Sequence, residues 1–166
     1  FDDLELKRGD LLLCGDPNFG EVDFSLSCRY DLREKFNLGL TLIHSFEYAE
    51  AEKVFVSILD DDRDCVMAYW ATAMSILNHP LSFRQNEESL ERGEELLKVA
   101  KTLIVNNERE KDYLDAVSIY FQDWQNLDTQ TRKLKYESKM EELYLKYPDD
   151  VETAVFYSLA ILATAE

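Results

Sequence analysis

The stretch "NLGLTLIHSFEYAEAEKVF", residues 37–55, carries the strongest structural signal in the chain. It opens with the pair Leu38-Gly39 and closes with Ala51 and Phe55, which are separated by three residues. A glycine lets two antiparallel helices approach closely, and Ala51 is the matching small residue on the second helix. The stretch therefore predicts a helical hairpin whose turn is "HSFEY", with Phe55 filling the joint to the next hairpin.

This spacing matches one unit of the tetratricopeptide-repeat (TPR) pattern, a helix-turn-helix of about 34 residues, laid on residues 32–65. The unit departs from the pattern at three positions, which are occupied by Lys35, Leu42 and Arg63. Trp70 and Met74 restart the pattern one period after Phe36 and Leu40. The sequence therefore predicts a TPR-like right-handed superhelix of divergent hairpins.

Helical periodicity and turn residues divide the rest of the chain. We expect seven helices, over about 31–45, 48–59, 65–77, 87–104, 109–124, 129–147 and from 149 onward. They group into hairpins at 31–64, 65–105 and 108–148, with a half repeat at 149–166. The fold class is therefore all-α, preceded by a short non-helical arm.

Residues 1–30 form this N-terminal arm. Its turn-rich segment is followed by Val22, Phe24 and Leu26, an alternation typical of extended chain with one apolar side. Asp31 and Glu34 have the spacing of a capping box and predict the start of the first helix.

Three longer segments carry a narrower resemblance: "FNLGLTLIHSFEYAEAEKVF", "DCVMAYWATAMSILNHPL" and "YPDDVETAVFYSLAILATA". Together they resemble a bacterial family of TPR proteins, whose members share Leu-His-Ser-Phe and a Met-Ala-x-Trp helix followed by His-Pro. Ala71 departs from the family, which tends to have glycine there. That family has no assigned reaction, so the resemblance implies the fold and a scaffold role.

The composition narrows the possible partners. The 166 residues are 46% hydrophobic and 31% charged, with a net charge of −16. This charge repels nucleic acid and anionic lipid; it either serves solubility or lines a groove for a basic partner.

No apolar run reaches the roughly 18 residues of a membrane span. The compartment is open: cytoplasmic, or periplasmic if an upstream signal peptide was removed.

His44 and His79 lie 35 residues apart, one more than the repeat period, at the ends of first helices in consecutive hairpins. Stacked hairpins would bring the two imidazoles together, and with Glu47 they are candidate ligands for a divalent metal. The alternative is that each imidazole caps the carbonyl groups at its helix end.

Four aromatic residues fall on helices expected to face the concave side of the superhelix: Tyr69, Trp70, Tyr120 and Trp124. Together with the two histidines, they are the candidate peptide-binding residues. The alternative is that they form the core between repeats.

Three cysteines, Cys14, Cys28 and Cys65, show no metal-binding spacing. They are expected to be reduced thiols, or to include a Cys14–Cys28 disulfide in an oxidising compartment.

The run "AVFYSLAILATA", residues 154–165, is apolar all round a helix and requires burial on both sides. We therefore expect it either to continue a longer array or to form a homodimer.

The leading hypothesis is a binding module that holds a protein or peptide partner, without a cofactor or a reaction of its own. The alternative is a metal-dependent enzyme, or an accessory domain of one, centred on His44 and His79.

Overall fold

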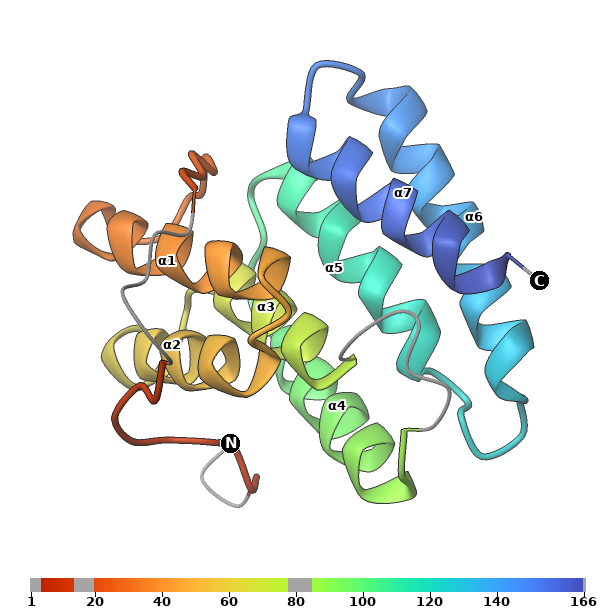
Figure 1. Ribbon diagram of the computed structural model, residues 1–166, viewed down its shortest axis with the longest axis horizontal. Helices are drawn as coiled ribbons and strands as arrows, with labels where there is room; N and C mark the ends of the chain where they lie inside the picture. The colour runs from red at the N-terminus through yellow and green to blue at the C-terminus, as the bar shows by residue number, and fades with distance from the viewer. Residues whose placement is uncertain (1–3, 14–19, 78–84, 166) are drawn as a thin grey trace.

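The computed structural model describes residues 4–13, 20–77 and 85–165 (Figure 1). The described residues form seven α-helices and no strand, which confirms the all-α class. After a 3₁₀ turn at Tyr30–Leu32, the helices are α1 (Arg33–His44), α2 (Tyr48–Asp61), α3 (Val66–Leu77), α4 (Glu87–Ala100), α5 (Glu108–Phe121), α6 (Thr129–Lys146) and α7 (Val151–Thr164). Each overlaps a helix expected from the sequence.

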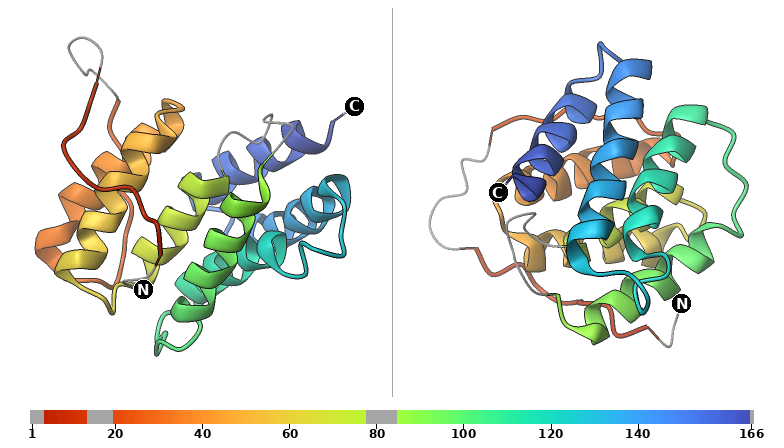
Figure 2. Two further views of the ribbon diagram at one scale, coloured as in Figure 1. Left: turned by 90° about the horizontal axis from the view of Figure 1, so that it is seen from below. Right: turned by 90° about the vertical axis from the view of Figure 1, so that its right-hand side faces the viewer.

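Consecutive helices pack against one another along the whole series, and α3 also packs against α5. The pair α1–α2 lies at one end of the molecule, α3–α4 in the middle and α5–α6–α7 at the other end (Figures 1 and 2).

Gly39 allows the close helix packing expected of it. A Cβ atom at this position would lie 2.4 Å from the Phe55 ring, so only a glycine accommodates that ring as it is placed. Phe55 is fully buried within its own hairpin, with its ring 5.3 Å from that of Phe36. Gly93 and Phe121 repeat this arrangement between α4 and α5, with a Cβ–ring distance of 2.2 Å.

Three helix boundaries differ from the expectation. The capping box is wrong: α1 begins after Leu32 without a side-chain cap, and Asp31 pairs instead with Arg29 at 2.6 Å. Helix α4 ends at Ala100 because tighter i→i−3 hydrogen bonds replace its last turn, which leaves Ile104 85% exposed. Helix α5 ends at Phe121, and Asp123 then adopts a left-handed φ of 58°.

The arm has the alternation expected of residues 22–26. Phe24 is buried, Val22 and Leu26 are half-buried, and the residues between them are exposed. The Phe24 ring stacks on Trp70 at 6.1 Å and meets the edge of Tyr113 at 5.7 Å. The arm therefore completes the core instead of lying loosely on it.

Trp70 stands at the centre of this core. Its ring contacts Tyr113 of α5 at 5.1 Å and Phe156 of α7 at 5.2 Å, both edge to face. Helices from the second, third and fourth units therefore converge with the arm on one side chain.

A disulfide joins Cys28 of the arm to Cys65, the residue before α3, with their Cα atoms 5.0 Å apart. The arm passes directly beside the start of α3, so both expectations for Cys28, a reduced thiol or a bond to Cys14, are wrong. Cys14 itself lies outside the described residues.

Helix α7 buries Thr153, Phe156 and Ala160, while Ile161 and Leu162 are 42% and 53% exposed. The described residues therefore do not bury both sides of α7, and the homodimer stays a prediction. No described helix combines the length and the apolar character needed to cross a membrane.

Candidate functional site

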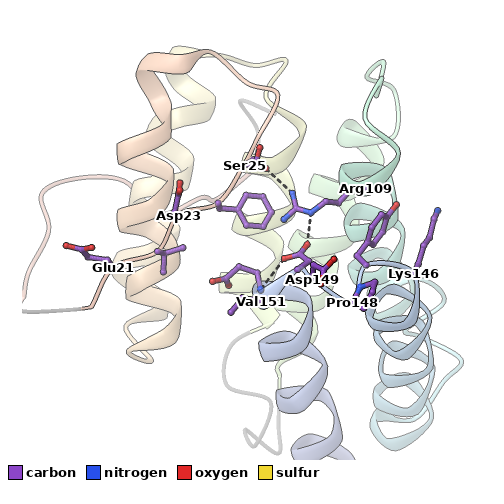
Figure 3. A pocket seen from close by; sticks show the side chains of 13 residues that line it. Glu21, Asp23, Ser25, Arg109, Lys146, Pro148, Asp149 and Val151 are labelled. Carbon is purple, nitrogen blue, oxygen red and sulfur yellow. Dashed lines mark hydrogen bonds and ion pairs between the residues drawn. The ribbon is translucent and has the colours of Figure 1, made fainter.

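A groove of about 680 Å³ opens between the arm, the start of α5 and the turn that joins α6 to α7 (Figure 3). Its lining comes from three separate parts of the chain: residues 21–25, Arg109, and residues 146–152.

The α6–α7 turn is built by local chemistry. Helix α6 ends at Lys146, two residues before Pro148, and α7 starts after Asp150. The Asp150 carboxylate is the N-cap of α7 and accepts hydrogen bonds from the backbone N–H groups of Glu152 and Thr153, at 3.1 and 3.4 Å.

Arg109 ties the walls of the groove together. Its Nε donates to Asp150 Oδ2 at 2.6 Å, and its Nη1 donates to the Ser25 carbonyl at 2.9 Å. The guanidinium also lies over the Phe24 ring, 4.3 Å from its centroid. One side chain thus fixes the arm against the start of α7.

Tyr113 also bonds Asp150, the carboxylate that Arg109 holds. Its hydroxyl donates to Asp150 Oδ2 at 3.0 Å and lies 2.6 Å from Thr153 Oγ1. Burial raises the pKa of the Tyr113 hydroxyl well above its usual range, so it stays protonated. Burial acts to raise the pKa of Asp150 as well, but the hydrogen bond and charge of Arg109 outweigh it and hold that pKa below its usual range.

The groove carries more acid than base. It is lined by five carboxylates and two cations: Glu21, Asp23, Asp149, Asp150, Glu152, Arg109 and Lys146. Lys146 is already held by Glu108 and Asp112, each at 2.7 Å. Within the described residues, the carboxylates of Glu21 and Asp149 have no cation within ion-pair distance.

His44 lies beside this groove but not with its expected partners. Its Nε2 is 2.8 Å from Glu152 Oε2, and its ring is 5.4 Å from that of Phe156. Glu47 is exposed, and His79 lies outside the described residues. In the described ranges, no group of three His, Cys, Asp or Glu side chains is arranged to hold a metal.

The aromatic candidates are mostly core. Tyr69 and Trp70 are 1% exposed and Tyr120 is 3% exposed, so these three do not line an open surface as expected. The Tyr120 hydroxyl donates to Gln85 Oε1 at 2.6 Å. Trp124 is half-buried beyond the end of α5, and its Nε1 has no hydrogen-bond partner among the described residues.

The charged residues that build the groove were not among the site candidates proposed from the sequence. Asp150 could have been found, because an aspartate just before a helical run is an N-cap signal. Arg109 could not, since its partners lie 41 residues downstream and 84 residues upstream.

Searches of protein-family models, curated proteins and solved structures found no match to this chain. Any statement about its function therefore depends on the geometry described above.

Proposed function

We propose that the chain is a protein-binding scaffold of the TPR type, a right-handed superhelix whose groove holds a basic segment of a partner protein. The observation that carries the proposal is the pair Glu21 and Asp149, two groove-lining carboxylates without a cation among the described residues. Glu21 belongs to the arm and Asp149 to the α6–α7 turn, so they line opposite sides of the groove (Figure 3).

The repeat pattern supports the scaffold part of this proposal. Gly39 packs against the Phe55 ring inside the first hairpin, and each helix contacts the next one along the chain. Stacked helical hairpins present extended surfaces, which repeat proteins use to hold other chains.

The lining supports a lysine- or arginine-bearing segment as the occupant. Pro148 and Val151 add apolar surface beside the carboxylates, and Val151 is 72% exposed. The aliphatic stem of a lysine or arginine can cover such surface while its charged end meets a carboxylate. The net charge of −16 favours the approach of a cationic partner.

The test is binding of a labelled library of lysine- and arginine-containing peptides, followed by fluorescence anisotropy. Each exposed ion pair contributes about 0.2–1 kcal/mol, so the double variant Glu21→Gln/Asp149→Asn should bind roughly two- to thirtyfold more weakly. The matched control is Glu88→Gln/Glu91→Gln, which removes two exposed charges from α4. Equal loss in both double variants, or no binding by any peptide, would refute the proposal.

The alternative, a metal-dependent enzyme or accessory domain centred on His44 and His79, gains no support from the described residues. The His44 imidazole is engaged by Glu152, which lies on α7 and joins the two ends of the helical series.

The Cys28–Cys65 disulfide supports an oxidising compartment such as the periplasm over the cytoplasm, where thiols are kept reduced.

A further inference from the structure

The helical body holds the main chain of the arm with pairs of oppositely charged side chains. In the first pair, Arg92 Nη1 donates to the carbonyl of Glu5 at 2.6 Å. Glu52 Oε1 accepts from the backbone N–H of Lys7 at 3.0 Å. The two side chains also contact each other at 2.9 Å.

A second pair repeats this arrangement farther along the arm. Lys53 Nζ donates to the carbonyl of Asp10 at 2.9 Å, and Glu50 Oε2 accepts from the N–H of Leu12 at 2.8 Å. Lys53 and Glu50 are 3.0 Å apart.

A third pair acts on the part of the arm next to the groove. Arg109 donates to the carbonyl of Ser25 at 2.9 Å, and Glu110 accepts from the N–H of Ser27 at 2.5 Å. All three pairs therefore bind the carbonyl of one residue and the N–H of the residue two positions later.

That spacing has a physical meaning. In extended chain, the carbonyl of residue i and the N–H of residue i+2 point to the same side, where a neighbouring strand would bond both. Each charged pair thus takes the place of a neighbouring strand and bonds main-chain atoms, so any preference for particular side chains comes from the other contacts of the segment.

The carboxylates of these pairs are buried. Glu52 and Glu110 are each 1% exposed, and Glu50 is 8% exposed. A buried carboxylate is costly unless it is hydrogen-bonded, and beneath the arm the N–H groups of Lys7, Leu12 and Ser27 supply such bonds.

Residues 4–13 themselves contribute little side-chain burial. Leu6 is buried, Leu4 and Leu13 are half-buried, and the other seven residues are exposed. Two basic side chains of this segment also contact α2: the Arg8 guanidinium donates two hydrogen bonds to Asp60, both at 3.0 Å, and Lys7 Nζ lies 3.6 Å from Glu52 Oε2. This segment runs beside α2 (Figures 1 and 2).

We propose that the surface of α2 and α4 beneath residues 5–12 is a binding site for an extended polypeptide, which the arm occupies in this structure. A partner segment displaces the arm when it presents an apolar residue followed by two basic ones, as Leu6, Lys7 and Arg8 do here. This site is separate from the groove and does not depend on the function proposed for it.

The test uses the full chain and a fluorescent peptide of residues 4–13, "LELKRGDLLL". The attached arm competes at an effective concentration in the millimolar range, so the wild-type chain should bind the peptide weakly. The variant Leu6→Ser loosens the arm and should bind the peptide at least tenfold more tightly.

Two modified peptides decide whether recognition is by the main chain. N-methylation of the Lys7 amide removes the donor to Glu52 and should abolish binding to the Leu6→Ser chain. N-methylation of the Leu11 amide, which the charged pairs do not contact, is the matched control and should leave binding intact. Neither peptide requires a variant of Glu52, which is buried and whose replacement threatens folding.

Three results would overturn the proposal. Equal binding of the two methylated peptides would show that the main chain is not recognised. Absence of peptide binding to the Leu6→Ser chain would show that the surface binds only the covalently attached arm. Dimers of that chain in light scattering would assign the surface to the arm of a second copy.

Discussion

Removing the Cys28–Cys65 disulfide should destabilise the protein by an amount that follows from its place in the chain. The two cysteines are 37 residues apart in sequence. Cross-linking a loop of this size removes roughly 13 cal/mol/K of entropy from the unfolded chain, which is about 4 kcal/mol at 25 °C. For a domain of this length, that loss lowers Tm by about 10 °C.

The perturbation is the double variant Cys28→Ala/Cys65→Ala, compared with the wild type in urea unfolding followed by tryptophan fluorescence. A thiol reductant should lower the unfolding free energy of the wild type by a similar amount and leave the double variant unchanged. This comparison separates the cross-link from the packing lost at Cys65, which is buried.

A thiol titration under denaturing, non-reducing conditions would refute the reasoning directly. The chain has three cysteines, so a bond between two of them leaves one reactive thiol. Three reactive thiols in freshly purified protein would show that the disulfide is absent.

Two further predictions concern helix packing and pH. Gly39→Ala places a methyl group 2.4 Å from the Phe55 ring and should cost about 1–3 kcal/mol in urea unfolding, part of which Phe55→Leu should restore; an unchanged unfolding free energy would contradict the packing described. Arg109 holds the pKa of Asp150 below its unfolded value of about 3.9, so this stabilisation is present above that pH and is lost as the pH falls through the folded-state pKa. The unfolding free energy of Asp150→Asn should therefore depend less steeply on pH below about 4 than that of the wild type, and equal slopes would argue against the Arg109 ion pair.

Helix positions were predictable because their signals are local. Pro148 marks the end of α6, Asn107 marks the start of α5, and the alternation around Phe24 marks the extended arm. The boundaries that failed depend on single backbone conformations, such as the left-handed Asp123, which no periodicity reveals.

The role of the aromatic residues depends on what lies across from them. The local sequence around Trp70 is compatible both with a helix face that lines a groove and with a core position. Trp70 is buried because Phe24 and Phe156, which are distant in sequence, pack against its ring. The same reason hid Arg109 and the charged pairs beneath the arm. A side chain that binds main-chain atoms leaves no pattern in the sequence of its partner.

The contact between α1 and α7 affects how the protein unfolds. In an open array, each repeat touches only its neighbours, so units fray from the ends and their stabilities add. Here His44 and Glu152 join the first helix to the last, and Ser27 and Glu110 join the arm to α5. Unfolding of either end therefore breaks contacts with the other end. We expect the seven helices to unfold together in a single thermal transition.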